Sequence, residues 1–295
     1  MKRAHGHAAR AAIESKARRR LACAVALCTV SLGIVDGVLA EEDSQPSGSA
    51  WQLLRAKYYG DQSMGLVDEN YMSLEVPGNT PDPASTPLTL RFSDDGGRRV
   101  KRVRVFVDNN PSPLVATFDF ARTPITEIDM HVRIDRFTSV RVVAETSDGS
   151  LEMRSAWVKA SGGCSAPPTD SSQGGVLGQI KLRPAADDKS ILVSIRHPNS
   201  SGFQIDPRTG DSIPARYISH ILIKAGEAPL LEVESGISVS ENPTFRVASD
   251  QSLLLPVSID AVDSVSQAHY IGSTQTTNPS ASAARTGSAM NGGYR

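Results

Sequence analysis

The sequence predicts an all-β protein with two antiparallel β-sandwich domains in tandem. Short runs of alternating apolar and polar residues recur along residues 87–159 and again along 179–259. This period of two is typical of strands with one buried face. A segment rich in Pro, Ser and Gly, residues 165–178, separates the two series and is interpreted as a linker. Outside residues 51–59, no long window has the 3.6-residue period of a helix.

The first domain is predicted to cover residues 41–164. Residues 51–59 are its best helix candidate, since their apolar side chains are spaced for one face. Residues 108–113 form a strong break, and residues 147–149 form a hairpin turn. The strands expected here are 88–92, 103–107, 114–120, 128–134, 140–146 and 151–159.

The second domain is predicted to cover residues 179–264. Its expected strands are 179–182, 191–195, 217–224, 230–233, 244–247 and 253–259. From residue 265 to residue 295 the composition is dominated by Ser, Ala, Thr, Asn and Gly. Such a segment has too few apolar side chains to offset the entropy cost of ordering, so we expect a disordered tail.

Residues 1–40 have the pattern of an export signal. The first 20 residues are basic, residues 21–35 are mostly apolar, and Val38-Leu39-Ala40 offers small residues where a signal peptidase reads them. The apolar stretch is shorter than the roughly 20 residues that a membrane span needs. We therefore expect cleavage near Ala40 and no membrane insertion afterwards. An arginine triplet at residues 18–20 leaves the choice between the Sec and Tat routes open.

Composition excludes some classes of function. The net charge is -1, aromatic residues make up 5% of the chain, and no basic stripe is interleaved with aromatic residues. Nucleic-acid binding is therefore not expected. The sequence shows no phosphate-binding loop, catalytic triad or paired carboxylates, so the chain is predicted not to be an enzyme and to need no cofactor or metal.

Cys164 is the most informative single residue. Of the three cysteines, Cys23 and Cys28 fall in the export signal, so the mature chain keeps one thiol. A single thiol cannot form an internal disulfide. Cys164 follows Gly162 and Gly163 and precedes a proline pair. Neither the glycine pair nor the proline pair is typical of a core position. We expect a functional thiol on a flexible segment, with an intermolecular disulfide or an incidental residue as the alternatives.

Several motifs together resemble a known pair of proteins. In the first half they are residues 107–116, residues 145–149 and Gly162-Gly163-Cys164, and these resemble SoxY, the periplasmic sulfur-carrier subunit of bacterial thiosulfate oxidation. In the second half they are residues 197–202, Gly210, residues 213–215, residues 217–218 and residues 242–245, and these resemble SoxZ, its partner. The fused arrangement is similar to SoxYZ-like carriers associated with quinoprotein dehydrogenases.

The resemblance implies the fold and the function in outline. Each half would be an immunoglobulin-like sandwich, and the two would pair within one chain. Cys164 would be the covalent attachment site for a sulfur-containing intermediate, carried on a flexible arm that includes Gly162 and Gly163. The implied partners are periplasmic redox enzymes: a quinoprotein dehydrogenase, a cytochrome c or enzymes of sulfur oxidation. The alternatives are a non-carrier adaptor for a dehydrogenase or its cytochrome, and a redox-regulated dimer.

The chain departs from the family at the arm. In the family the arm ends in Gly-Gly-Cys-Gly-Gly at a free C-terminus, whereas here Ser165 and Ala166 follow and the chain continues. A thiol tethered at both ends leaves open whether it enters a deep active site. No cation or helix start lies beside Cys164 in sequence. We therefore expect an exposed thiol whose reactivity rises toward roughly pH 8.5.

The remaining candidates are interpreted as structural. His131, His197, His220 and His269 lack the spacing of metal ligands, and His197 is expected to end a strand and bond to backbone. The aromatic residues Phe118, Trp157 and Tyr217 are expected in the core or an interface. The charged run at residues 98–102 is expected to form a solvated turn, with guidance of a partner as the alternative.

Overall fold

The computed structural model describes residues 49–66, 68, 70–93, 97–120, 125–169, 176–253 and 256–274. The predicted export signal, residues 1–40, lies outside the described residues. So do residues 170–175 of the predicted linker and residues 275–295 of the predicted tail.

The described chain contains one helix and is otherwise built of strands, as predicted. The helix at 51–59 is found, and the strands predicted from the alternating pattern are present with shifted ends. In chain order the elements are α1 Ser49–Tyr59, β1 Met64–Leu66, β2 Met72–Glu75, β3 Thr86–Phe92, β4 Val100–Val107, β5 Leu114–Phe120, β6 Ile125–Val132, β7 Thr138–Thr146, β8 Leu151–Val158, β9 Ile180–Pro184, β10 Ser190–Ile195, β11 Ile218–Ala225, β12 Ala228–Ser235, β13 Thr244–Ser249, β14 Val257–Asp263 and β15 His269–Ser273.

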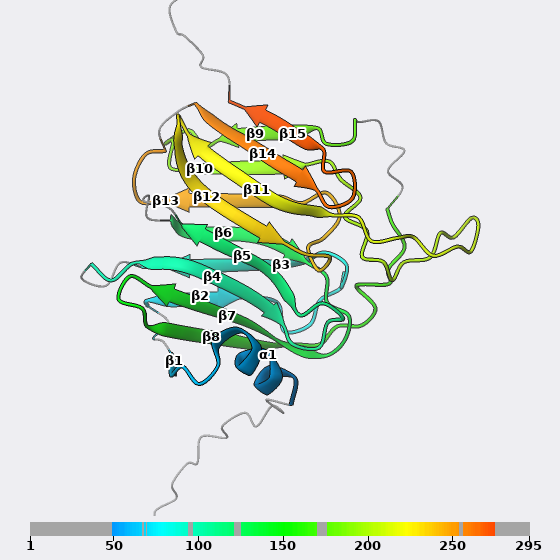
Figure 1. The fold of residues 1–295 in the computed structure, drawn as a ribbon, viewed down its shortest axis with the longest axis horizontal. Coiled ribbons are helices and arrows are strands. Elements are labelled where there is room, and N and C mark those ends of the chain that lie inside the picture. The colour runs from blue at the N-terminus through cyan, green and yellow to red at the C-terminus, as the bar shows by residue number, and fades with distance from the viewer. Residues whose placement is uncertain are drawn as a thin grey trace, which may run out of the picture. The chain divides into compact units, whose positions relative to one another are not determined.

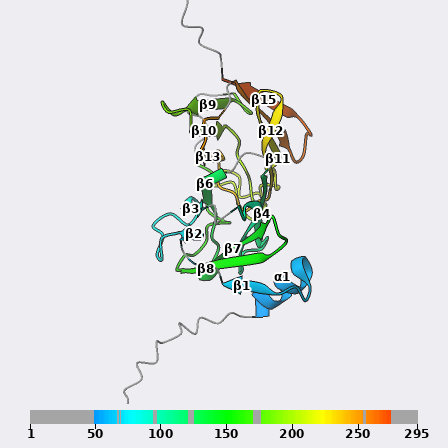
Figure 2. The same cartoon turned by 90° about the vertical axis from the view of Figure 1, so that its left-hand side faces the viewer.

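The strands form two sheets packed face to face (Figures 1 and 2). One sheet has nine strands in the order β1-β8-β7-β4-β5-β12-β11-β14-β15, and the other has six in the order β2-β3-β6-β13-β10-β9. The pairs are antiparallel except for β1 with β8, which run parallel. The prediction of an all-β fold built from antiparallel sandwiches is confirmed.

Both sheets continue from the first half of the chain into the second. Strand β5 pairs with β12, from Leu231 opposite Phe120 to Ser235 opposite Ala116. Strand β6 pairs with β13 in the other sheet. An unpaired sheet edge exposes a row of backbone donors and acceptors, and these two ladders satisfy the edges where the halves meet. The two sandwiches are therefore joined edge to edge.

One apolar core runs through both halves. Strand β3 alternates buried and more exposed side chains, as a strand with one core face should. The core that such strands build includes residues from the first half and from the second, and Phe118 on β5 meets Phe245 on β13 in an edge-to-face contact with ring centroids 6.4 Å apart. The halves therefore share apolar burial as well as backbone ladders.

The helix α1 packs on the outer face of the nine-stranded sheet at its first-half end, over β4, β7 and β8 (Figure 1). Its Trp51 and Tyr59 pack with Phe106, Val143 and Leu151 in a second, smaller apolar cluster. This explains why β7 is buried on almost every residue, because it has the core on one side and the helix on the other. Among the described residues no helix has the length and apolar character to cross a membrane.

Two predicted boundaries are wrong. Residues 265–274 are not a disordered tail: they include strand β15, which pairs with β14 from Ser273 opposite Ser258 to His269 opposite Val262. Residues 165–169 are not a freely flexible part of the linker, because they are bound to the second half through hydrogen bonds. Strands β1 and β2 were not predicted either.

Candidate functional site

Cys164 lies in a turn that follows the last strand of the first half. After β8 ends at Val158, the chain crosses to the segment that follows β6. There the amide of Gly162 donates to the carbonyl oxygen of Asp135 at 2.7 Å, and the amide of Gly163 donates to that of Ile134 at 3.0 Å. We call residues 161–169 the arm. The first half of the chain therefore binds the arm just before the thiol.

The second half binds the arm on the other side of the thiol. The hydroxyl group of Ser201 donates to the backbone carbonyl of Cys164. The side-chain amide of Gln204 donates to the carbonyl of Ala166 at 2.9 Å. Further along, the amide and hydroxyl groups of Thr169 both donate to the carboxylate of Glu241. The arm therefore bridges the two halves through hydrogen bonds.

The thiol is buried, and the prediction of an exposed thiol is wrong for this conformation. Cys164 is 0% exposed. Its burial comes from residues far away in sequence, which the local run of glycine and proline does not reveal. Cys164 nevertheless belongs to neither of the two apolar clusters. Releasing the arm requires breaking the hydrogen bonds described above.

The two glycines have a steric role in this arrangement. A Cβ atom on Gly163 would overlap the carbonyl oxygens of Pro83 and Ile134. Gly162 has a φ of 78°, a backbone conformation that costs a residue with a side chain about 1–2 kcal/mol. Glycine at these two positions thus allows the arm to lie flat against the chain.

Burial changes the acidity of the thiol. Desolvation raises the pKa of Cys164 to about 12, because the thiolate loses the stabilisation that water provides, and the charge of Asp135 adds to the shift. Arg133 and Arg136 act in the opposite direction without offsetting it. The expectation of an ordinary thiol pKa is therefore wrong for the bound arm, in which the thiol is protonated at neutral pH.

Arg133 is a buried cation next to the arm. It is 2% exposed. Its Nη1 donates to the carbonyl of Gly163 at 3.3 Å, and its Nη2 donates to that of Asn199 at 3.4 Å. Within the described part of the chain its Nε has no hydrogen-bond partner. Burial lowers the pKa of Arg133, while the acidic groups of Cys164 in its thiolate form, Glu241 and Asp82 oppose that shift.

The backbone around Arg133 is held by Asn110, from the break predicted at residues 108–113. The side-chain nitrogen of Asn110 donates to the carbonyl of Arg133 at 2.7 Å, and its side-chain oxygen accepts from the amide of Asp135 at 2.9 Å. The amide of Arg133 donates to the carbonyl of Ser238 at 2.7 Å. Sequence analysis missed both Arg133 and Asn110. A polar residue inside a break gave the only local signal for Asn110.

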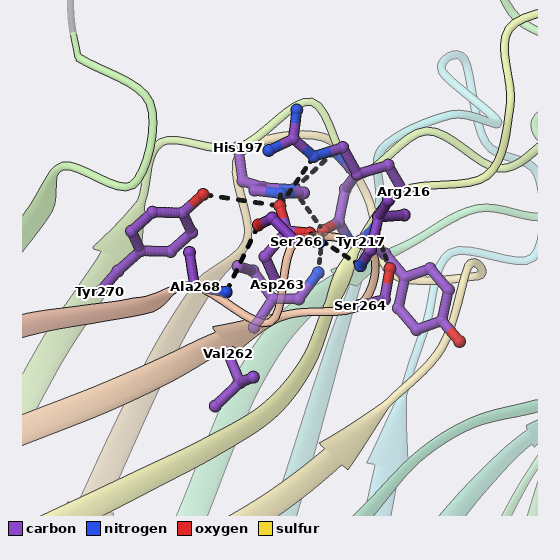
Figure 3. Close-up of polar contacts among 12 residues, drawn as sticks. His197, Arg216, Tyr217, Val262, Asp263, Ser264, Ser266, Ala268 and Tyr270 are labelled. Atoms are coloured by element: carbon purple, nitrogen blue, oxygen red, sulfur yellow. Dashed lines mark hydrogen bonds and ion pairs between the residues drawn. The ribbon is translucent and has the colours of Figure 1, made fainter.

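A polar cluster forms around the buried carboxylate of Asp263 (Figure 3). His197 accepts a hydrogen bond from the amide of Asn199 at its Nδ1, as expected for a backbone-bonded histidine. Its Nε2 therefore carries the proton and donates to Asp263 Oδ2 at 3.0 Å. Arg216 Nε donates to the same oxygen at 2.7 Å. Sequence analysis missed the contacts with Asp263 and Arg216.

The cluster positions Asn199, whose backbone carbonyl accepts from Arg133. The side-chain oxygen of Asn199 accepts from the amide of Ile218 at 2.9 Å. Burial lowers the pKa of His197 and outweighs the opposite effect of Asp263. For Asp263, burial raises the pKa, but hydrogen bonds from His197, Ser266, Val265 and Arg216 together lower it well below its ordinary value. Asp263 is therefore charged, and His197 is neutral.

The other candidates stay apart from the thiol site. His220 lies 2.7 Å from Glu232 and His269 lies 2.9 Å from Asp260, both as side-chain pairs. The described residues contain no group of three or more His, Cys, Asp or Glu side chains arranged to hold a metal ion. Phe118 is in the core, whereas Trp157 and Tyr217 are partly buried, as is His131. In the charged run, Arg102 pairs with Asp119 at 2.6 Å.

Comparisons with known proteins give a family for each half. The family described as sulfur oxidation protein SoxY matches residues 55–164, and the family described as sulphur oxidation protein SoxZ matches residues 181–276. A search of curated proteins found no match. The SoxY match ends at the thiol residue itself.

Solved structures give weaker similarities. The sulfur carrier protein SoxY from Chlorobium limicola f thiosulfatophilum is 23% identical with a TM-score of 0.33, covering 38% of this chain and 92% of that one. A superoxide reductase (neelaredoxin) from Ignicoccus hospitalis is 6% identical with a TM-score of 0.26, covering 30% and 79%. A putative superoxide reductase from Thermotoga maritima is 11% identical with a TM-score of 0.28, covering 33% and 92%. At these TM-scores the similarities support no argument about function.

The two family matches and the paired sandwiches define a carrier protein of sulfur oxidation. The chain belongs to the SoxY and SoxZ families, with a SoxY domain followed by a SoxZ domain in one polypeptide.

Proposed function

We propose that the protein is a periplasmic carrier that holds a sulfur-containing intermediate covalently on Cys164 and presents it to partner enzymes. The observation that carries this proposal is the position of the thiol. Cys164 ends the SoxY match and is buried by an arm that hydrogen bonds hold, outside both apolar clusters. Such an arm can leave its binding site without unfolding the sandwich.

The chemistry of loading follows from the thiolate. When the arm is released, water surrounds the sulfur and its pKa returns toward about 8.5. The thiolate attacks a sulfur of an incoming disulfide-type compound: one S–S bond forms with Cys164, one breaks, and the leaving sulfur takes the electron pair. The bound arm keeps the thiol protonated and unreactive, so release of the arm controls the reaction.

The loop that binds the arm also exposes apolar side chains. Phe203 and Ile205 are 50% and 49% exposed, and they lie on the same loop as Ser201 and Gln204. Exposed aromatic and aliphatic groups of this kind are typical of the centre of a protein interface. A partner that binds Phe203 and Ile205 would act on the loop whose buried Ser201 and Gln204 hold the arm. Partner binding and arm release are thereby coupled.

The expected partners are enzymes of sulfur oxidation, a quinoprotein dehydrogenase or a cytochrome c. The export pattern of residues 1–40 and the resemblance to fused SoxYZ-like carriers support a periplasmic location and a dehydrogenase partner. Fractionation of cells, with N-terminal sequencing of the recovered protein, tests the location. A start near Glu41 in the periplasmic fraction is expected, and a start at Met1 in the membrane fraction would contradict it.

The burial of Cys164 also favours a second candidate, a non-carrier adaptor that binds a dehydrogenase or its cytochrome. Intact mass of protein purified from the periplasm without reductant separates the two. The carrier predicts sulfur-sized mass increments that are absent from the Cys164→Ala variant. The adaptor predicts an unmodified monomer, and full activity of Cys164→Ala in the cell. A doubled mass would instead indicate a redox-regulated dimer.

A further inference from the structure

We propose that Arg133 binds an anionic, oxygen-bearing group carried on Cys164, such as a sulfonate attached through sulfur. The inference rests on the carrier function proposed above, and it adds a residue of this chain that binds the cargo. The guanidinium of Arg133 lies against the residue that precedes the thiol, because its Nη1 donates to the carbonyl of Gly163.

The unsatisfied hydrogen-bonding capacity of Arg133 indicates a ligand. A guanidinium has five N–H donors in a planar fork, a geometry that matches oxyanions. Here its two contacts are long, at 3.3 and 3.4 Å, and both acceptors are neutral carbonyls. Its buried Nε has no hydrogen-bond partner in the described part of the chain, and Glu241 and Asp82 act on the guanidinium through their charges without a hydrogen bond to it. A buried charge without a hydrogen-bonded counter-ion is costly, so the site favours an anion that can accept from the guanidinium.

The unmodified thiol does not supply that anion. In the bound arm Cys164 is protonated at neutral pH, because burial raises its pKa to about 12. A protonated thiol adds no negative charge beside Arg133, so the nearby negative charge comes from Glu241 and Asp82, neither of which is hydrogen-bonded to it. A cargo whose charge does not depend on the thiol, such as a sulfonate, would supply both the negative charge and oxygen acceptors for Nε.

The neighbouring charges are consistent with this role for Arg133. Arg136 also lowers the pKa of Cys164, but its side chain is 66% exposed and pairs with Asp135 at 3.2 Å. Its charge is therefore screened by water and partly compensated. Asp135 opposes an anion in the site, and its pair with Arg136 reduces that effect. Arg133 is thus the buried cation available to the cargo, and Asn110 fixes its backbone.

Two adducts of similar size on Cys164 of the full chain test the proposal. Tetrathionate gives the anionic adduct: the thiolate attacks a central sulfur, a Cys–S–S–SO₃⁻ group forms, and thiosulfate leaves. Hydroxyethyl disulfide gives a neutral adduct in the same way, and 2-mercaptoethanol leaves. Mass spectrometry follows the release of each adduct by dithiothreitol at neutral pH. Each rate is divided by the rate for the same adduct in urea-unfolded chain, which gives a protection factor free of intrinsic reactivity.

In the wild type, the protection factor of the anionic adduct is expected to exceed that of the neutral adduct by at least roughly tenfold, the ratio expected for one hydrogen bond to a charged group. The Arg133→Gln variant should lose the difference. The matched control Arg141→Gln removes another buried arginine, one that pairs with Asp108 at 2.7 Å. This control should retain the difference between the two protection factors.

Equal protection of the two adducts in the wild type would overturn the proposal, and so would a difference that persists in Arg133→Gln. If Arg133→Gln does not fold, Arg133→Lys replaces it, because lysine retains the charge without the planar guanidinium fork. The ratio of the anionic to the neutral protection factor should then be reduced. An unchanged ratio contradicts the proposal. The wild-type comparison needs no variant. Because both adducts are made in vitro, the outcome does not depend on whether cells load Cys164, which the intact-mass experiment measures separately.

Discussion

The hydroxyl group of Ser201 donates a hydrogen bond to the backbone carbonyl of Cys164. The SoxZ domain thus directly holds the thiol residue of the SoxY domain. The same loop binds the next part of the arm through Gln204 and Ala166. In the proposed carrier, the thiol is unreactive while it is bound, so these contacts would set how often Cys164 becomes available.

Removing the contacts that hold the arm should make the thiol react faster. In Ser201→Ala and in Gln204→Ala, the labelling rate of Cys164 at pH 8 is expected to rise roughly fivefold, because a typical hydrogen bond contributes about 1 kcal/mol to the bound state. The measurement is the rate of modification by a thiol reagent in the folded protein. Thr89→Ala is the control, since its hydroxyl binds Asp129 and does not contact the arm. Equal rates in all four proteins would show that these contacts do not limit release.

Stability should decrease at high pH because of Cys164. Its pKa in the folded chain is raised to about 12, above the value of about 8.5 for an unfolded thiol. The contribution of the protonated thiol is therefore fully present below about pH 8.5 and is lost as pH rises toward the folded value. Urea unfolding at pH 7, 9 and 10 should show a steeper loss in the wild type than in Cys164→Ala. Parallel pH profiles would mean that the thiol titrates normally.

Adding one methyl group to the arm should prevent it from binding. In Gly163→Ala the new Cβ overlaps the carbonyl oxygens of Pro83 and Ile134. We expect a loss of about 1–3 kcal/mol in the bound state, as for other overpacked sites, and fast labelling of Cys164. Gly78→Ala is the matched control, because its nearest contact would be Trp157 O at 4.0 Å. Slow labelling of Gly163→Ala would contradict the bound geometry.

The cluster around Asp263 should be important for stability. Asp263→Asn removes a buried charge that His197 and Arg216 both contact, and the expected loss is about 3–5 kcal/mol in urea unfolding. Because the folded pKa of Asp263 is lowered, its contribution is present above about pH 4 and is lost as pH falls further. Asp260→Asn, which breaks a more exposed pair with His269, should cost only about 0–1 kcal/mol. Similar losses in both variants would rule out a special role for the buried cluster.

The strands were predictable because alternation is local. Strand β3 alternates along its length, so its residues alone indicate one buried face. Strand β15 was missed because it is a peripheral strand with no fully buried side chain, so its sequence, His269–Ser273, lacks apolar alternation. Strand β15 is held in place by its backbone pairing with β14, which its composition does not reveal.

The sequence singles out Cys164 as the candidate site residue, but its burial was not predictable. Counting cysteines and recognising the glycine pair identified Cys164. Its environment comes from Ile134, Ser201 and other residues tens of positions away in the chain, and a local run of glycine and proline carries no information about them. Arg133 was missed for a related reason: a charged residue after a strand usually faces water, and only tertiary packing shows that this one does not.

The continuous sheets have a consequence for how the protein unfolds. Opening the SoxZ half would break the β5–β12 and β6–β13 ladders and expose apolar residues of the SoxY half in the same step. Calorimetry should therefore record a single cooperative transition, with calorimetric and van't Hoff enthalpies in agreement, even though two families contribute to the chain. The SoxY and SoxZ domains are therefore expected to fold and unfold together as one thermodynamic unit.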